Sequence, residues 1–197
     1  MKIRVVGIGN GGCNIADRLG HSAVFADTDT VYYDYETDDL HRHSDERSVK
    51  CLLDIDCQFD FNIFGDHYDI TIIASSLGGR ATSAFSRRIT KEYRRWSKLT
   101  IGIVTFPFVC EGPQRNIAAE STYNDLKTDF DIIIVQKTEF IPGDMPVNHI
   151  NTPLCETVCR ALEQFIYEHT PNAPTLKSLL ISSVEPQWSA TDFLTVV

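Results

Sequence analysis

Short apolar runs alternate with segments of helical periodicity along most of the chain. Continuous apolar runs at 3–8, 23–27, 69–75, 100–105 and 131–136 predict strands buried on both faces, as parallel strands are. Apolar residues at helical spacing predict helices at about 12–20, 81–98, 114–127 and 152–169. Repeated strand–helix units predict an α/β fold with a Rossmann-like, doubly wound, mainly parallel sheet and helices on both faces. In such a sheet, ligands bind at the carboxyl ends of the strands.

Two regions lack this pattern. Residues 30–66 are the least regular, and the acidic, histidine-bearing stretch 32–46 within them indicates a surface loop or short helix, with metal binding by His41, His43 and the nearby carboxylates as a minor alternative. Residues 171–197 contain proline and show no regular period, so they are expected to be an irregular tail. We expect residues 1–197 to form a single domain.

Composition and charge narrow the class of protein. The apolar fraction of 43% and the charged fraction of 23% are typical of soluble globular proteins. No apolar run approaches the roughly 18 residues of a membrane span, and no signal peptide is visible, so no membrane partner and a cytoplasmic location are expected. The six cysteines include no CxxC pair, which argues for reduced thiols and against a metal site.

The net charge of −9 is unevenly distributed. Seven Lys and Arg residues fall within 80–98, and the rest of the chain is strongly acidic, which disfavours nucleic-acid binding. In the predicted helix 81–98, apolar residues occupy one face and basic residues the other. The basic face is interpreted as a solvated surface, with contact to an acidic partner or a neighbouring subunit as the alternative.

The first glycine-rich loop follows the first predicted strand, in the run Gly7-Ile8-Gly9-Asn10-Gly11-Gly12-Cys13-Asn14. Glycines allow close approach of the backbone to a ligand, and the helix start that follows offers N–H groups that suit a phosphate. The Gly-x-Gly-x-x-Gly spacing also fits a dinucleotide fingerprint, with Asp27 or Asp29 as its acidic residue. An NAD-type oxidoreductase is therefore one alternative.

Two later loops also follow predicted strands. In residues 74–84, Gly78 and Gly79 can expose amides, hydroxyl side chains can donate to phosphate oxygens, and Arg80 can supply a bidentate cationic contact. The alternative for this loop is an unliganded turn with capping hydroxyls. In residues 104–115, Glu111 can bind ribose hydroxyls with Arg115 bracing it, or the two can form a surface ion pair worth under about 1 kcal/mol.

These loops, in this order, resemble the nucleotide domain of the tubulin/FtsZ family over about residues 1–170. The first loop matches the family's glycine loop, Ala26-Asp27-Thr28-Asp29 resembles its second loop, and Leu77-Gly78-Gly79 begins like its GGGTGTG signature. The most specific match is Thr105-x-Pro107-Phe108-x-x-Glu111-Gly112-x-x-Arg115, which resembles the ribose-side loop. The resemblance implies GTP or GDP as ligand, with Mg²⁺ as a further possible cofactor. The nucleotide-binding residues that it implies are Gly9, Asn10, Gly11, Gly12, Cys13, Asn14, Asp29, Gly78, Gly79, Arg80, Thr82, Thr105, Pro107, Glu111, Arg115 and Lys137.

The chain also departs from the family pattern. The signature continues Arg80-Ala81-Thr82-Ser83-Ala84, so three glycines are replaced, and no γ-phosphate loop is recognisable within 40–65. Gln136-Lys137-Thr138 and Thr157 stand where the family has guanine-contacting residues. The segment 172–177 carries neither catalytic aspartate, and placing Asp192 there needs an insertion. We therefore name no catalytic residue, expect little or no GTP hydrolysis, and expect 171–197 to be a tail or a remnant of the catalytic-loop region without the usual C-terminal domain.

The sequence predicts a divergent FtsZ-like protein that binds a guanine nucleotide. It would act as a nucleotide-dependent assembly or partner-binding module, with itself or a full-length FtsZ-like protein as partner, because family proteins stack head to tail. A protein–protein scaffold that has lost nucleotide binding is the main alternative, supported by the replaced glycines.

Overall fold

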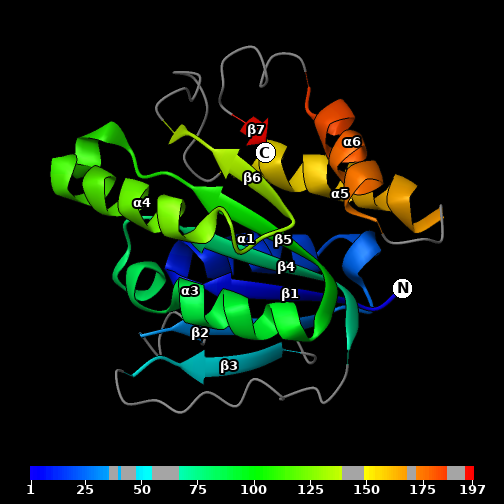
Figure 1. Cartoon of the computed structure of the whole chain (residues 1–197), viewed down its shortest axis with the longest axis horizontal. Coiled ribbons are helices and arrows are strands. Elements are labelled where there is room, and N and C mark those ends of the chain that lie inside the picture. The colour runs from blue at the N-terminus through cyan, green and yellow to red at the C-terminus, as the bar shows by residue number, and fades with distance from the viewer. Residues whose placement is uncertain (36–39, 41–47, 55–66, 139–148, 168–171, 186–193) are drawn as a thin grey trace.

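The computed structural model describes residues 1–35, 40, 48–54, 67–138, 149–167, 172–185 and 194–197, shown in colour in Figure 1. Within them, one sheet has the strand order β3-β2-β1-β4-β5-β6-β7. The strands are β1 (Ile3–Ile8), β2 (Asp29–Asp34), β3 (Ser48–Leu52), β4 (Tyr68–Ser76), β5 (Ser97–Thr105), β6 (Ile132–Gln136) and β7 (Leu194–Val196). Neighbouring strands run parallel, except that β7 is antiparallel to β6. The predicted doubly wound, mainly parallel α/β fold is confirmed.

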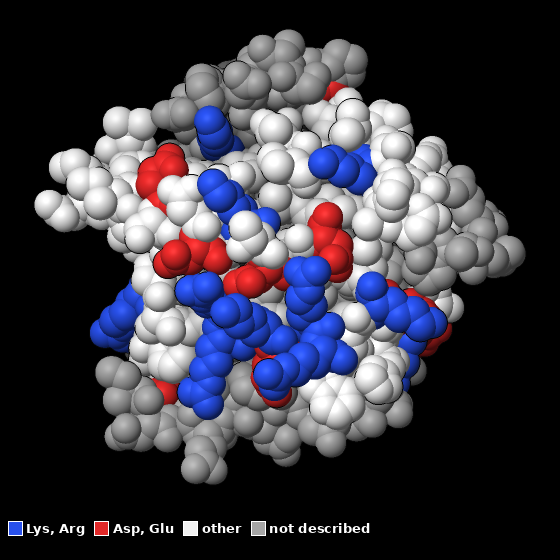
Figure 2. All heavy atoms as spheres, in the orientation of Figure 1, with Lys and Arg blue, Asp and Glu red and all other residues white. Residues whose placement is uncertain are grey.

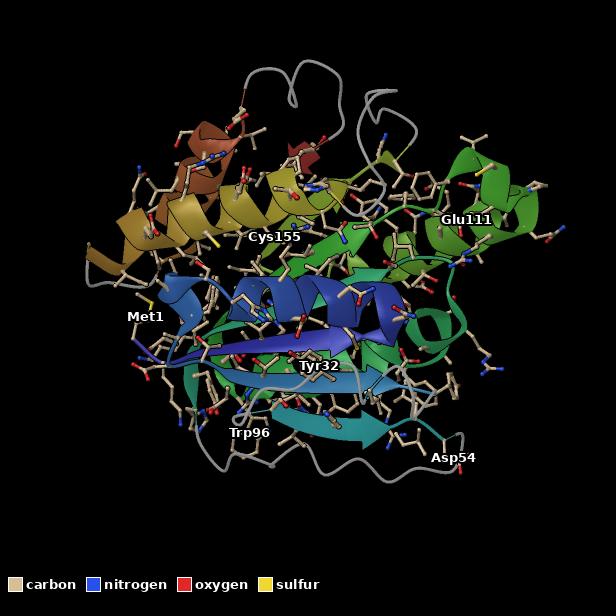
Figure 3. The ribbon with its side chains drawn as sticks, turned by 180° about the vertical axis from the view of Figure 1, so that it is seen from behind. Met1, Tyr32, Asp54, Trp96, Glu111 and Cys155 are labelled. Atoms are coloured by element: carbon tan, nitrogen blue, oxygen red, sulfur yellow. The ribbon has the colours of Figure 1, made fainter. Side chains whose placement is uncertain are left out.

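Helices cover both faces of the sheet (Figures 1 and 3). The helical elements are α1 (Gly9–Gly20), the 3₁₀ turn η1 (Ala23–Phe25), α3 (Arg80–Arg95), the 3₁₀ turn η2 (Val109–Glu111), α4 (Pro113–Leu126), α5 (Thr152–Tyr167) and α6 (Ala173–Ser183). Because side chains alternate along a strand, Val5 and Ile72 join the core under α1, α5 and α6, whereas Val6 and Ile73 join the core under α3 and α4. Burial on both faces explains the uninterrupted apolar runs in the central strands.

The predicted second strand was wrong. Residues 23–25 form η1, where Phe25 fills the core beside α1, and the strand itself is β2 at Asp29–Asp34. β2 pairs in parallel with β1, from Arg4 opposite Asp29 to Ile8 opposite Tyr33. Its Thr-Val-Tyr-Tyr run is less apolar than residues 23–26, but β-branched and aromatic residues suit a pleated strand, and this strand is buried.

Two further boundaries differ from the prediction. Helix α3 ends at Arg95 instead of continuing to residue 98, because Ser97 already pairs with Tyr68 at the start of β5. Strand β3 lies within residues 30–66, where the sequence predicted no strand, and the end of β2 takes up residues 32–34 of the stretch predicted to be a surface loop or short helix. His41 and His43 lie outside the described residues.

The predicted irregular tail is also wrong where the structure describes it. Residues 173–183 form α6, and 194–196 form β7. The side chain of Asn172 caps α6 by accepting a hydrogen bond from the Thr175 amide at 2.8 Å, and a proline is tolerated in the first turn. Leu176 and Leu180, one helical turn apart, are fully buried against the core on the α5 side. The prolines thus mark the start of a helix here.

The basic face of α3 lies on the surface seen in Figure 2, where Lys and Arg side chains gather over this helix. Much of this charge is paired, because Arg94 lies 2.9 Å from Asp131, Arg87 lies 3.5 Å from Asp129, and Arg95 bonds Glu92 on its own helix. Phe85, on the opposite face, is buried. The predicted division of this helix into two faces is confirmed.

Among the described residues, no helix combines the length and the apolar character needed to cross a bilayer.

Replacing Leu180 by alanine should destabilise the protein by about 2–5 kcal/mol, because a fully buried leucine leaves a cavity when it is truncated. The matched control is Ile181→Ala on the same helix, where the side chain is 54% exposed and the expected change is within about 0.5 kcal/mol. Urea unfolding measures both. Equal effects of the two substitutions would show that α6 does not pack on the core as described.

Candidate nucleotide site

The site lies where the strand order of the sheet reverses. β1 and β4 are neighbours at the centre of the sheet, while the chain after β1 builds outward to β2 and β3 and the chain after β4 builds outward to β5 and β6. A crevice therefore forms at the carboxyl ends of β1 and β4, which is the usual ligand position in doubly wound sheets. Helices α1 and α3 begin at this crevice, at Gly9 and Arg80, directly after these two strands.

The glycines of the first loop let α1 press against the end of β4. Gly9 has a φ of +70°, a left-handed conformation that favours glycine. A Cβ added at Gly11 would overlap the Ser76 hydroxyl, and one added at Gly12 would overlap the backbone of Ala74. This contact holds the first turn of α1, with its N–H groups, at the edge of the crevice.

A first cavity of about 190 Å³ opens between the starts of α1 and α3. The positive ends of two helix dipoles converge on it, an arrangement that favours a bound anion. Arg80 also lines it, and the Arg80 guanidinium lies 4.5 Å from the centre of the Tyr35 ring. The lining residues are Ile8, Gly9, Asn10, Gly11, Asp34, Tyr35, Ser76, Gly79, Arg80, Ala81, Thr82 and Arg115.

A second cavity of about 380 Å³ adjoins the first. The two share Asn10, Gly11, Ser76 and Arg115, so together they form one groove along the carboxyl edge of β1, β4, β5 and β6. Where they meet, the Ser76 and Thr105 hydroxyls are hydrogen-bonded at 2.8 Å. The remaining lining residues of the second cavity are Leu77, Thr105, Phe106, Pro107, Phe108, Glu111, Thr138, Ile150 and Asn151.

Glu111 is fixed at the wall of the second cavity. One carboxylate oxygen accepts a hydrogen bond from the Phe108 amide at 2.7 Å, and the other lies 2.7 Å from the Arg115 guanidinium. Gly112, with a φ of +95°, turns the chain into α4, whose first residue is Pro113. Figure 3 shows Glu111 beside α4, on the side of the molecule opposite Met1. The carboxylate thus borders the groove with Arg115 bracing it.

The far end of the second cavity lies beside β6 and the start of α5. The buried Gln136 side chain donates to the Ile150 carbonyl at 2.6 Å, which holds Ile150 and the adjacent Asn151 at the cavity wall. Thr138 donates to the Phe106 carbonyl at 3.0 Å. The Thr157 hydroxyl is buried and bonds its own helix at Pro153, so it does not reach the groove.

Most of the sequence-predicted site residues meet in this groove. Those that line one or both cavities are Gly9, Asn10, Gly11, Gly79, Arg80, Thr82, Thr105, Pro107, Glu111 and Arg115. They come from three loops that lie far apart in the sequence and adjoin only through the pairing of β1, β4 and β5. The structure therefore brings together three of the four segments in which the resemblance was found, whereas no residue of the fourth, 26–29, lines either cavity.

Five predicted residues lie near the groove without lining it. Gly12 and the buried Cys13 pack inward, and the Cys13 thiol faces the Tyr33 carbonyl at 3.7 Å. Asn14 donates to the Asn10 side chain at 2.9 Å and lines neither cavity, and Lys137 also lines neither. Gly78, with a φ of +74°, packs against Arg115, where a Cβ would come within 2.8 Å of Cγ. Gly12, Gly78 and Cys13 therefore support the loops through packing contacts and do not line the groove.

Asp29 lies at the opposite edge of the sheet. It is the first residue of β2, five positions and about 16 Å before the strand's carboxyl end. Its carboxylate accepts a hydrogen bond from the Tyr68 hydroxyl, and the buried Arg4 guanidinium stacks 3.6 Å from the Tyr68 ring centre. The sequence placed the second strand at 23–27, which would put Asp29 just after its carboxyl end. Because the strand instead begins at Asp29, this residue does not belong to the groove.

The residues that sequence reasoning missed come mainly from the end of β2. Asp34 and Tyr35 line the first cavity, and the Asp34 carboxylate accepts a hydrogen bond from the Tyr35 amide at 2.7 Å. The signal that could have found them is the β-branched and aromatic run 30–33, followed by an acid at the strand end. Thr138 and Asn151 were also missed as lining residues.

The groove fits a nucleotide in size and chemistry. Arg80 lies against the Tyr35 ring and leaves the first cavity open, and the second falls within the 300–1,000 Å³ typical of small-molecule sites. The described residues contain no group of three or more His, Cys, Asp or Glu side chains placed to hold a metal ion. Asp34 is the acidic residue lining the first cavity, so Mg²⁺ there would depend mainly on phosphate oxygens and water.

The predicted position of the catalytic aspartates carries no carboxylate. Residues 172–177 form the cap and first turn of α6, where the Asn172 side chain bonds the backbone. Asp192, the alternative candidate, lies outside the described residues.

No family model matches the chain, but individual FtsZ proteins do. It is 28% identical over 163 residues to the cell division protein FtsZ of Helicobacter pylori (strain ATCC 700392 / 26695), which covers 73% of this chain and 40% of that protein. The chain thus spans less than half the length of this relative.

Solved structures share the fold at low sequence identity. The empty FtsZ dimer of M. jannaschii superposes with a TM-score of 0.69 and 23% identity over 82% of this chain and 54% of the other. CetZ2 of Haloferax volcanii, solved as a protofilament bound to GTPγS, gives a TM-score of 0.64 and 15% identity over 84% of this chain and 58% of the other. By sequence and by architecture, the chain is thus an FtsZ-like domain with the fold of the tubulin/FtsZ family, as the resemblance of its loops predicts.

Proposed function

We propose that this chain binds GTP or GDP in the groove at the carboxyl edge of its sheet. The observation that carries the proposal is the convergence of the three predicted loops on two adjoining cavities. The phosphates would occupy the first cavity, where two helix N-termini and Arg80 supply positive charge. The ribose and base would occupy the larger second cavity, with Glu111 accepting from ribose hydroxyls.

Guanine is favoured by the relatives. The chain's sequence relatives are named FtsZ, and CetZ2, which shares its fold, was solved with a GTP analogue bound. The dinucleotide alternative gains one observation, because Asp34 ends β2 at the position where NAD-binding sheets carry an acidic residue for the ribose. That acid lies beside the Tyr35–Arg80 pair in the smaller cavity, which leaves little room for an adenosine.

We propose further that hydrolysis is slow or absent. A positioned carboxylate that activates water contributes on the order of 100- to 10,000-fold, and residues 172–177 contain none. The protein would then hold its nucleotide as a structural ligand that sets the shape of the groove and its rim.

The rim of the groove offers a surface for a partner. Val109 and Ile117 are 68% and 63% exposed, and they lie two and six positions from Glu111 in the sequence, in the turn before α4 and at the start of α4. Exposed apolar side chains beside a ligand site suit a contact whose strength depends on the ligand. CetZ2 was solved as a protofilament, and the FtsZ relatives are division proteins. We therefore propose nucleotide-dependent assembly with a second copy or with a full-length FtsZ-like protein, in cell division or a related process.

The test of nucleotide binding is direct. Nucleotide extracted from the purified protein is identified by mass spectrometry, and the emptied protein is titrated with GTP, GDP, ATP and NAD by calorimetry. The expected result is guanine nucleotide in the extract and micromolar or tighter binding of GTP or GDP. Preference for NAD would support the dinucleotide alternative, and absence of binding by all four would support a scaffold that has lost its ligand.

Glu111→Ala should weaken GDP binding by about tenfold or more, because the site loses a charged acceptor for ribose hydroxyls. The control is Glu120→Ala on the exposed surface of the same helix, α4, which should leave the affinity unchanged. Calorimetry measures both. An unchanged affinity in Glu111→Ala would show that the nucleotide lies elsewhere.

Adding GTP to the protein, alone or mixed with a full-length FtsZ, should increase its sedimentation coefficient, while phosphate release stays at the level of buffer. Ile117→Asp should abolish the increase without changing GTP affinity, because it places a charge in the apolar rim. The control Ile181→Asp alters an exposed isoleucine on α6 and should assemble normally. Sustained phosphate release would contradict slow hydrolysis, and unchanged sedimentation in both settings would contradict the assembly role.

A further inference from the structure

The second cavity suits a flat aromatic ring with polar groups along one edge. Apolar side chains from three segments of the chain line much of it, namely Leu77, Phe106, Phe108 and Ile150. The Phe106 ring makes an edge-on contact with Tyr123 of α4, with centroids 5.6 Å apart. Thr138 and Asn151 supply polar groups where the cavity adjoins β6 and the start of α5. A purine placed against these apolar walls would therefore face Thr138 and Asn151 with its edge.

The Thr138 hydroxyl can act towards a ligand as an acceptor only. A threonine hydroxyl has one proton and two lone pairs. The proton is donated to the Phe106 carbonyl at 3.0 Å, and the Phe106 amide in turn donates to the Gln136 carbonyl at 2.9 Å. Thr138 is 8% exposed, so packing also holds it in place. A ligand group that faces this hydroxyl must therefore be a hydrogen-bond donor, because a carbonyl there would meet only lone pairs.

Asn151 brings a side-chain amide to the same end of the cavity, on a backbone that is held from two sides. The buried Gln136 side chain donates to the carbonyl of the preceding residue, Ile150, at 2.6 Å. The Asn151 carbonyl accepts a hydrogen bond from the Cys155 amide at 3.1 Å, in the first turn of α5. The Asn151 side chain can donate through Nδ2 and accept through Oδ1. This end of the cavity therefore combines a fixed acceptor with an amide that offers both kinds of group.

We propose that Thr138 and Asn151 are the specificity-determining residues for the base, with the Thr138 hydroxyl accepting from the 2-amino group of guanine. This inference rests on the proposed guanine-nucleotide site. Guanine presents O6, N1–H and the 2-amino group in that order along one edge. The Asn151 amide matches O6 and N1–H with one donor and one acceptor, which leaves the amino group to Thr138. Glu111, the acid among the described residues lining this cavity, is paired with Arg115, so the base is recognised by neutral hydrogen bonds.

The experiment compares GDP with IDP, whose hypoxanthine base differs from guanine only in lacking the 2-amino group. Calorimetry should show that the wild-type protein binds GDP about fivefold to tenfold more tightly than IDP, which is the contribution of one neutral hydrogen bond. Thr138→Val keeps the shape of the side chain and removes the acceptor, so GDP and IDP should then bind within about twofold of each other. Thr122→Val is the matched control, because Thr122 is also 8% exposed, donates to the Ala118 carbonyl at 2.8 Å and lines neither cavity. It should keep the wild-type preference for GDP.

Asn151→Ala separates recognition of the amino group from recognition of the rest of the edge. It should weaken the binding of GDP and IDP alike, by about fivefold to tenfold, because both bases carry O6 and N1–H. Thermal unfolding confirms that each variant is folded. Equal binding of GDP and IDP by the wild-type protein, a GDP preference that persists in Thr138→Val, or unchanged affinities in Asn151→Ala would overturn this inference and leave the nucleotide site intact. Absence of GDP binding by the wild-type protein would overturn the proposed function as well.

Discussion

The close approach of α1 to the carboxyl end of β4 is the constraint on which the rest of the structure depends. Gly11 and Gly12 allow it, because a Cβ at either position would overlap the last residues of β4. The contact lies at the centre of the sheet, where the chain reverses its direction of strand addition. It therefore places the N–H groups of one helix start beside those of another and aligns the ribose-side loop with both. A side chain at either glycine would push apart the three loops that form the groove.

The architecture of the family is kept in this chain, while the residues of the loop 74–84 have changed. The family signature has glycines at the positions of Arg80, Thr82 and Ala84 of this chain, and of these Arg80 and Thr82 line the first cavity. The accommodation comes from Tyr35, whose ring receives the guanidinium at the wall.

Much of the fold follows from local sequence patterns. The central strands β1, β4, β5 and β6 were predicted because burial on both faces demands continuous apolar runs. The errors occurred where a local signal competed with packing. Residues 23–26 are more apolar than 30–33, yet Phe25 serves the core from a 3₁₀ turn and the tyrosines of β2 complete the sheet. Helix α6 was not predicted, because in the sequence alone a proline in the first turn of a helix cannot be told from a proline that ends one.

The sequence by itself determined the doubly wound sheet and the three loops of the groove. Both depend on requirements that single residues express, namely apolar side chains in buried strands and glycines where the backbone must approach closely. Only the tertiary structure decided that Asp34, and not Asp29, faces the groove, and that Arg80 lies along its wall on Tyr35. The reason is that these positions follow from the register between β1 and β2 and from the packing of α3 on β2. Such contacts join segments distant in sequence, and no local pattern along the chain records them.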